Sequence, residues 1–296
     1  MPDDIAGEGS SGLISRARHA FHAGLLTGVL FSGARATPTN ADGSNPLSVK
    51  IAQGLASRLK GEMTARDRLA GQRAGHQFEE LCLEFVRKTF LQLSTFRPGI
   101  WDVRRSANVT EFEQYAHLAD LHDLVKREPR FAAALQRDYL ISPDIVIARH
   151  PETDANLNAT GAIVDADSAR LTGFREANGK TALLHASISC KWTIRSDRVQ
   201  NSRAEALNLV RNRKGHLPHV VVVTGEPLPS RLAAIAMGTG DIDCVYHFAL
   251  DELVETVREL ATAPRRPATD ALGLVTTMIE GKRLKDISDL PLDLVI

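Results

Sequence analysis

Apolar and polar residues alternate regularly along one stretch in the second half of the chain. Over 184–194 every even-numbered residue is apolar, and the odd-numbered residues between them are polar. A period of two is typical of a β-strand that buries one of its faces. The pattern therefore predicts a strand here, with Ser189 and Lys191 projecting from the same face.

Helical spacing follows directly after this strand. Apolar residues between Val199 and Val210 recur at helical intervals, which predicts a helix over 196–213 with Ser196 as its N-cap. The segment Arg195-Ser-Asp-Arg198 lies at the start of that helix. A lysine at a strand end and an Arg/Asp/Arg group at a helix start are therefore expected close together.

The first half of the chain has mainly helical periodicity. Residues 1–20 are mostly small and polar, and residues 34–46 are rich in Thr, Asn, Gly, Ser and Pro, so residues 1–40 are expected to form a loose N-terminal region. Helices are predicted over 47–59, over 74–93, after the capping-box pair Thr110 and Glu113, and as a short fourth helix at Pro129.

Strands dominate the expectations for the second half. They are predicted from Asp144 after Pro143, over 219–223 and over 244–250, with a helix over 251–260. Residues 151–180 are polar and fit a hairpin or a long excursion better than a second domain. This order of elements predicts one α/β domain over residues 1–296, with a helical N-terminal part.

The composition fits a folded enzyme better than a protein that coats nucleic acid. The chain has 296 residues, 43% hydrophobic and 24% charged, which is enough for a substantial core. Lys plus Arg and Asp plus Glu both number 36, so the formal net charge is zero. Binding through bulk positive charge is disfavoured, but a local basic cleft with a bound metal remains open.

The cysteines point to a reducing compartment. Cys82, Cys190 and Cys244 lie far apart, without the paired spacing of metal ligands. We therefore expect a cytoplasmic protein with reduced thiols. The apolar run over 23–31 is short and contains Gly28, so no signal peptide or membrane span is predicted.

Several residues near the strand ends match the needs of metal-assisted phosphodiester hydrolysis. That reaction requires carboxylates for a divalent cation and a positive group that stabilises developing charge. Asp144 and Lys191 supply one of each. Ser189 stands where many nucleases of this type have a second acid, and a hydroxyl is a weak ligand for a hard cation. Glu205 on the next helix can replace that acid, and Glu79 is a further candidate.

The same residues also have ordinary interpretations. A Pro-Asp pair before a strand is common turn chemistry, and Glu205 and Glu79 are by default solvated acids. Arginine binds guanine O6 and N7 in the major groove, and aspartate accepts from cytosine N4. Arg195, Asp197 and Arg198 therefore match adjacent G and C bases, although an exposed ion pair at a helix start would have the same sequence.

Taken together, the motifs resemble those of the NgoMIV-type type II restriction endonucleases. These belong to the CCGG-cutting group of Pro-Asp…(Asp/Glu)-x-Lys nucleases, in which Ser replaces the acid before the Lys and a Glu from the following helix takes its place. The matching motifs are Pro143-Asp144, Ser189-Cys-Lys191-x3-Arg195-Ser-Asp197-Arg198-x6-Glu205, Gln72-Arg-x-Gly75-x-x-Phe78-Glu79 and Arg231. The resemblance spans about residues 40–250.

The resemblance implies a restriction-endonuclease-like core, a central mixed β-sheet flanked by helices. It also implies a Mg²⁺-dependent centre. Asp144, Lys191 and Glu205 form that catalytic centre, with Glu79 nearby and Ser189 and Cys190 lining it. Asp144, Glu205 and the backbone carbonyl of Cys190 would hold the metal.

The resemblance further implies how DNA is read. Arg195, Asp197 and Arg198 would read CCGG from the major groove, and Gln72 would read from the minor-groove side. Arg231 would contact an outer G:C pair, which favours GCCGGC, with help from a polar residue of the 44–45 region.

Family members cut before the first C of CCGG and leave a four-base 5′ overhang. They act as homotetramers that hold two duplexes of DNA, and the excursion over 151–180 resembles their tetramerisation segment. A palindromic site by itself calls for two-fold symmetry in the protein, so at least a dimer is expected.

Two other functions stay open from the sequence. A non-catalytic DNA-binding protein would keep the reading residues and bind without cutting. A related nuclease of the same fold would cut with a different specificity or none.

Overall fold

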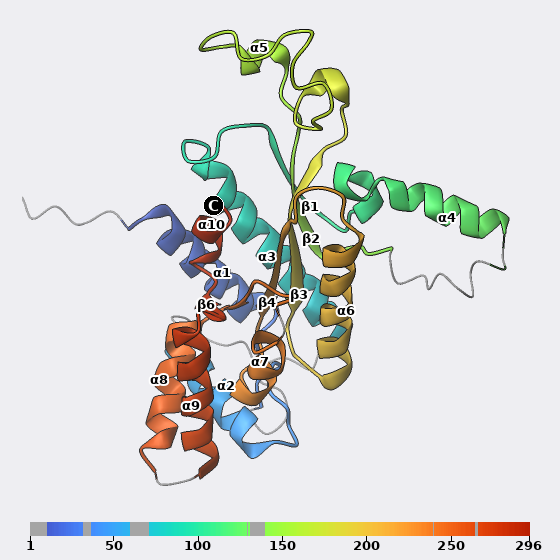
Figure 1. Ribbon diagram of the computed structural model, residues 1–296. Helices are drawn as coiled ribbons and strands as arrows, with labels where there is room; N and C mark the ends of the chain where they lie inside the picture. Colours follow the sequence, from blue (N-terminus) through green and yellow to red (C-terminus); the bar gives the residue numbers. More distant parts are fainter. Residues whose placement is uncertain are drawn as a thin grey trace, which may run out of the picture.

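The computed structural model describes most of the chain, and the structural statements below refer to that part. The described residues are 11–31, 37–59, 71–128, 130, 140–238, 240–263 and 266–296. Figure 1 shows a central sheet with helices packed around it.

The sheet has six strands in the described residues, in the order β1-β2-β3-β4-β5-β6. β1, β2 and β3 pair antiparallel, whereas β3 to β6 pair parallel. The predicted mixed sheet is therefore confirmed. The strands are β1 Trp101–Arg105, β2 Ile145–Arg149, β3 Leu183–Lys191, β4 His219–Thr224, β5 Cys244–His247 and β6 Leu284–Asp286.

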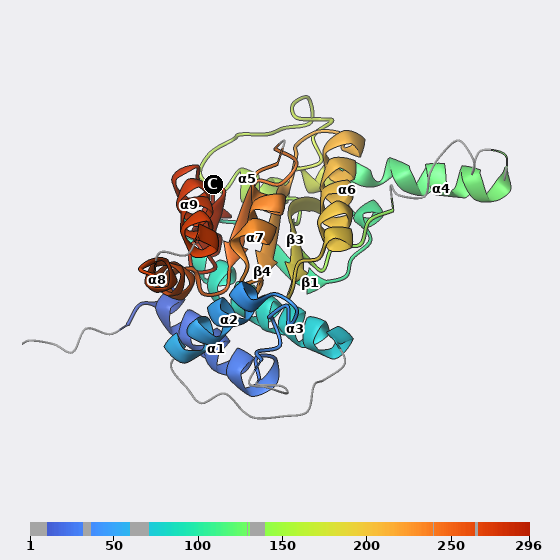
Figure 2. The ribbon, with the colours of Figure 1, turned by 90° about the horizontal axis from the view of Figure 1, so that it is seen from below.

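Helices cover both faces of this sheet. Figure 2 shows α1 and α3 on one side and α6 and α7 on the other. The α-helices are α1 Leu13–Gly28, α2 Pro46–Arg58, α3 Gly71–Phe90, α4 His117–Arg127, α5 Asp154–Leu157, α6 Ser196–Asn212, α7 Pro229–Ala236, α8 Leu250–Ala261, α9 Arg266–Glu280 and α10 Leu290–Asp293. One hydrophobic cluster joins these helices, except α5, to the sheet. The number of domains over 1–296 stays a prediction, because parts of that range lie outside the described residues.

β3 is buried more deeply than its alternating pattern predicts. Its apolar even positions are buried as expected, but His185 and Ser187 on the other face are buried too. The reason is that β3 lies inside the sheet, between β2 and β4, with helices on both faces. The strand also ends at Lys191, earlier than predicted. Ser189 and Lys191, near that end, keep partial exposure.

The predicted loose N-terminal region is wrong over Leu13–Gly28, which form α1. Phe21 and Leu25 are buried at helical spacing. The ring of Phe21 lies 5.7 Å from that of Phe85 on α3. The helix therefore forms because its apolar face packs against α3, although small and polar residues dominate its sequence.

The helix predicted after Thr110 and Glu113 begins later. Asn108 and Glu111 form the capping box, at the start of a 3₁₀ turn over Val109–Glu111. A second 3₁₀ turn and then α4 follow, and α4 projects away from the sheet in Figure 1. The short helix predicted at Pro129 falls outside the described residues.

Residues 151–180 form a long excursion, and the hairpin alternative is wrong. They contain the short helix α5, a 3₁₀ turn over Glu176–Asn178 and one isolated bridge between Glu152 and Arg175. Arg175 donates to both oxygens of Asp154, at 2.6 and 2.7 Å. The segment is therefore held by its own contacts and extends from one end of the sheet (Figure 1).

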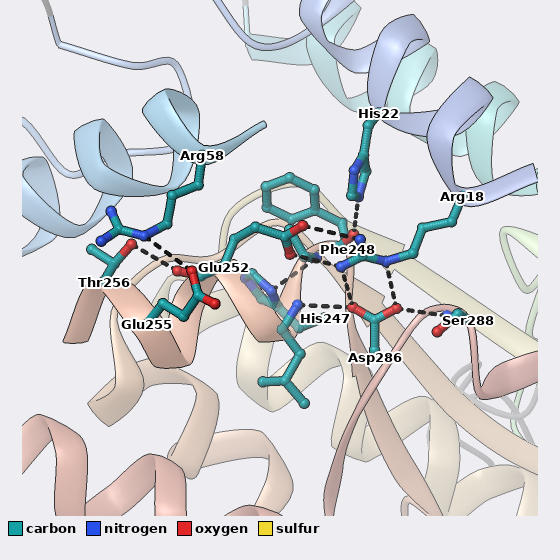
Figure 3. A network of polar contacts seen from close by, with 12 residues as sticks. Arg18, His22, Arg58, His247, Phe248, Glu252, Glu255, Thr256, Asp286 and Ser288 are labelled. Atoms are coloured by element: carbon teal, nitrogen blue, oxygen red, sulfur yellow. Dashed lines mark hydrogen bonds and ion pairs between the residues drawn. The ribbon is translucent and has the colours of Figure 1, made fainter. Parts of the chain in front are cut away.

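A buried polar network ties the N-terminal helix to the last third of the chain (Figure 3). Arg18 of α1 donates to Asp286 of β6 at 2.9 Å and to Glu252 of α8 at 3.0 Å. Burial alone would raise the pKa of Asp286, but the hydrogen bonds and charge of Arg18 outweigh it and lower that pKa. His22 binds the Phe248 carbonyl at 2.7 Å. The C-terminal elements therefore complete the sheet and anchor α1.

None of the described helices combines the length and the apolar character needed to cross a bilayer.

Candidate active site

The antiparallel pairing of β2 and β3 brings two distant segments together. Ile145, the first residue of β2, pairs with Ile188 near the end of β3. Asp144 precedes Ile145, so it lies beside the last residues of β3. The predicted partners Ser189 and Lys191 are in that same stretch.

The Asp144 carboxylate is the centre of this cluster. Its Oδ2 accepts hydrogen bonds from Lys191 Nζ at 2.9 Å and from the Cys190 backbone N–H at 2.7 Å, with Ser189 Oγ at 3.5 Å. The side chains of Asp144 and Lys191 are 23% and 19% exposed, so solvent reaches the pair. The structure brings Asp144, Ser189 and Lys191 together and confirms that Ser189 and Lys191 share a face.

Glu205 on α6 belongs to the same electrostatic cluster. Burial raises its pKa, Lys191 opposes that rise, and Asp144 adds to it. Burial would lower the pKa of Lys191, but Asp144 and Glu205 outweigh it and raise that pKa. Lys191 is therefore held as an ammonium ion beside two carboxyl groups.

The donor set fits a hard divalent cation. Asp144 raises the pKa of Glu205, so the two carboxyl groups repel each other, and a bound cation would relieve that repulsion. Mg²⁺ is typically held by one or two carboxylates, with waters and substrate phosphate completing its shell. Asp144, Glu205 and the Cys190 carbonyl are the groups that could hold it. The described residues contain no ready group of three His, Cys, Asp or Glu ligands.

Glu79 lies at the same end of the sheet but is paired elsewhere. Its Oε2 accepts from Arg105 Nη2 at 3.0 Å and lies 3.4 Å from His76 Nδ1. Arg105 ends β1 and pairs with Ile145, next to Asp144. Glu79 therefore pairs with an arginine that the sequence patterns did not single out, because β1 itself was not predicted.

The Cys190 thiol lies in the core, and its pKa is raised by burial and by the neighbouring Cys82 thiol of α3. A thiol that is buried and protonated is a poor nucleophile and a poor metal ligand. Any metal contact from this residue would therefore come from its backbone, as the sequence comparison implies.

The segment that is expected to read the inner base pairs lies at the start of α6. Arg195 is exposed and is the N-cap residue, so the prediction that Ser196 caps the helix is wrong. The side chains of Asp197, Arg198 and Gln72 fall outside the described part of the structure. Their roles in reading stay predictions.

Arg231 lies in the first turn of α7, next to two acids that the sequence patterns missed. It forms an ion pair with Asp42, and its Nη1 lies 3.7 Å from Glu226 Oε2. The expected helper in the 44–45 region is engaged locally, since Asn45 caps α2 and Ser44 donates to Asp42. A single acid in a loop gives no sequence signal, so only the fold could reveal Asp42.

Comparisons with known proteins identify the family of this chain. A family model described as NgoMIV restriction enzyme matches residues 21–296. The Type II restriction enzyme NgoMIV of Neisseria gonorrhoeae is 50% identical over 290 residues, which are 96% of this chain and 99% of that enzyme.

Two solved structures are also similar. One is a restriction endonuclease PspGI–substrate DNA complex, with a TM-score of 0.35 and 14% identity, covering 76% of this chain and 61% of that chain. The other is the type IIF restriction endonuclease Bse634I with cognate DNA, with a TM-score of 0.33, 15% identity and 88% of each chain covered.

The resemblance seen in the motifs is thus confirmed over most of the sequence. This chain belongs to the NgoMIV restriction enzyme family, and it is therefore a type II restriction endonuclease, a site-specific enzyme that acts on double-stranded DNA and whose family implies a divalent metal ion.

Proposed function

We propose that this enzyme hydrolyses double-stranded DNA at GCCGGC, cuts as G/CCGGC with Mg²⁺, and leaves four-base 5′ overhangs. The observation that carries the proposal is the contact of Lys191 with Asp144 beside Glu205, next to the start of α6. Two carboxyl groups and an ammonium group are the parts that metal-assisted phosphodiester hydrolysis needs.

The protein's own groups have distinct tasks at this centre. Asp144 and Glu205, with the Cys190 carbonyl, would hold Mg²⁺, which supplies charge stabilisation at the phosphate and activates water when bound. Lys191 presents its ammonium group to the developing negative charge. Asp144 fixes the position of that group through the 2.9 Å hydrogen bond. Ser189 lines the site, and Glu79, which pairs with Arg105, lies nearby.

The proposed reading residues are the basis for the proposed cleavage sequence. In this proposal Arg195, Asp197 and Arg198 read CCGG from the major groove, and Gln72 reads from the minor groove. An arginine is complementary to guanine and an acid to the N4 amino group of cytosine. The observed pair of Arg231 with Asp42 therefore matches one outer G:C pair.

The assembly follows from the symmetry of the site. A palindrome is read by two copies related by a two-fold axis, so the enzyme is at least a dimer, and we propose a tetramer that holds two duplexes. The excursion over 151–180 exposes Ile163 and Leu171 at 64% and 96%. Exposed apolar side chains on a projecting segment suit an assembly surface. Sedimentation of the free enzyme would measure its oligomeric state.

The first experiment is digestion of a plasmid with two GCCGGC sites, with Mg²⁺ and with EDTA, followed by sequencing of the cut ends. Cuts confined to GCCGGC and dependent on Mg²⁺ support the proposed site and the proposed metal. Cuts at other CCGG-containing sites would still support Mg²⁺-dependent hydrolysis but would contradict the proposed outer base pair. Binding without any cut contradicts the catalytic assignment.

A further inference from the structure

Glu226 is a buried carboxylic acid that the active centre described above does not use. It follows β4, and 0% of its surface is exposed. A buried carboxylate is costly unless hydrogen bonds and opposite charge compensate it. Its contacts therefore indicate what the protein gains by placing an acid there.

Those contacts join two segments that carry arginines of the reading set. Glu226 Oε2 accepts from the Ile194 N–H at 2.8 Å, and Ile194 directly precedes Arg195. Glu226 Oε1 accepts from the Leu228 N–H at 3.1 Å, and Leu228 is the N-cap of α7, which carries Arg231. One carboxylate thus binds the backbone before both arginines.

The same turn is bonded to the catalytic strand. The Glu226 N–H donates to Thr224 Oγ1 at 3.2 Å, and that hydroxyl donates to the Lys191 carbonyl at 2.7 Å. The Gly225 N–H also donates to the Lys191 carbonyl, at 3.2 Å. Across the turn, Asn40 Nδ2 donates to the Gly225 carbonyl at 2.9 Å. A short chain of hydrogen bonds therefore runs from Lys191 to Glu226.

We propose that Glu226 is a positioning residue for specificity, which fixes Arg195 and Arg231 relative to each other and to Lys191. Hydrolysis then depends on the inner and outer base pairs being read together. The inference rests on the proposed function, because it needs Arg195 and Arg231 to contact DNA.

The contacts require an ionised acid and not only a polar group. Both oxygens accept from N–H donors, and Arg231 lies beside Oε2. Burial raises the pKa of Glu226 to about 7, the two N–H groups and Arg231 oppose the rise, and Asp42 adds to it. His247 on the neighbouring strand β5 stays neutral, since burial lowers its pKa to about 4. A proton on Glu226 would remove one hydrogen-bond acceptor, so the backbone before Arg195 or before Arg231 would be bound less tightly.

The test uses Glu226→Gln, which keeps the shape but replaces one acceptor by a donor. We would measure kcat/KM on a duplex with GCCGGC and on one with both outer pairs changed to A:T. The ratio of the two values is expected to fall about tenfold or more, since one well-placed arginine–guanine pair gives discrimination of that order. Arg231→Ala provides the reference for complete loss of outer-pair reading.

Asp286→Asn is the matched control. Asp286 is also a buried acid that accepts from backbone N–H groups and pairs with an arginine, but it lies in the network of Figure 3. The Asp286→Asn variant is expected to have a lower unfolding temperature but an unchanged ratio of the two kcat/KM values. An unchanged ratio in Glu226→Gln, or an equal fall in Asp286→Asn, overturns the proposal.

The wild-type enzyme gives a second test that needs no variant. Its ratio is expected to fall as the pH drops from about 8.5 to about 6, because Glu226 gains a proton over that range. A flat ratio overturns the inference. A wild-type enzyme that never distinguishes the outer pair contradicts the proposed GCCGGC site instead, so the two failures are separable.

Discussion

Lys191→Met is the sharpest test of the active centre, because it removes the ammonium group and keeps much of the side-chain volume. In the structure this group lies 2.9 Å from Asp144 Oδ2, and its charge lowers the pKa of Glu205 against the effect of burial. Loss of one preorganised charge-stabilising group costs about 10²- to 10³-fold in rate, or about 3–4 kcal/mol of transition-state stabilisation. Cleavage at saturating Mg²⁺ is expected to fall by that factor.

A second consequence follows from the pKa of Glu205. Lys191 currently holds that pKa down against burial and the charge of Asp144, so its removal raises the pKa further. The acid limb of the rate profile is therefore expected to move to higher pH. Single-turnover cleavage of a short duplex across pH measures both effects, and a gel-shift assay without Mg²⁺ is expected to show unchanged DNA binding.

Lys285→Met is the matched control for this experiment. Lys285 Nζ also pairs with an aspartate, Asp293, at 2.6 Å, but on β6 and α10 and not beside Asp144. The cleavage rate of the Lys285→Met variant is expected to equal that of the wild type. Cleavage by Lys191→Met within about tenfold of the wild-type rate would refute the catalytic role. Equal losses in both variants would trace the effect to a general loss of stability.

Three further outcomes are expected. Glu205→Gln should abolish Mg²⁺-dependent cleavage. As the pH is lowered, the wild-type rate should begin to fall at a higher pH than an ordinary glutamate would give, because burial and Asp144 raise the pKa of Glu205 more than Lys191 lowers it. Cleavage rates measured across pH check this. Arg18→Ala should cost about 3 kcal/mol in urea unfolding, since it leaves two carboxylates without their cation, whereas Arg58→Ala, whose acidic partners are 63% and 70% exposed, should cost less than about 1 kcal/mol. Gly225→Ala should cost about 1–3 kcal/mol, because its Cβ would lie 2.3 Å from the Trp192 ring, whereas Gly273→Ala, open inside α9, should stabilise by about 0.5–1 kcal/mol; thermal unfolding of both variants tests the contrast.

The sequence predicted elements whose apolar pattern is long and regular. β3, β4 and α3 were all expected within a few residues of their observed bounds. Their burial pattern is enforced locally, by alternation in strands and by helical spacing in α3. The proximity of Asp144 and Lys191 was also predicted, because each residue belongs to a short polar motif at the end of a predicted strand.

Other elements form for reasons that a local pattern does not contain. β1 has the charged sequence Trp-Asp-Val-Arg-Arg and is a strand because β2 offers it an edge to pair with. α1 is a helix because Phe21 finds a partner on α3. In both cases tertiary contacts decided the local structure.

The acids around Arg231 show the same limit at the level of function. Asp42 lies in a turn rich in Gly and Ser, and Glu226 lies in a Pro-containing turn, so each looks like an ordinary loop acid in the sequence. Only the fold shows that Asp42 pairs with Arg231 and that Glu226 is buried. The sequence does not distinguish a buried acid from an exposed one, because the burial of a side chain depends on which segments pack over it.

The location of the site follows from the change of strand direction within the sheet. Because β2 is antiparallel to β3, the start of β2, with Asp144, meets the end of β3, with Lys191. Because β4 is parallel to β3, the end of β4 and the turn with Glu226 reach the same edge. The Asp144–Lys191 pair and the segments that we propose read DNA therefore lie at one edge of the sheet, and α6 begins there with Arg195. A chain with no net charge can in this way gather arginines and acids at one edge of its sheet, where we propose that they act together on DNA.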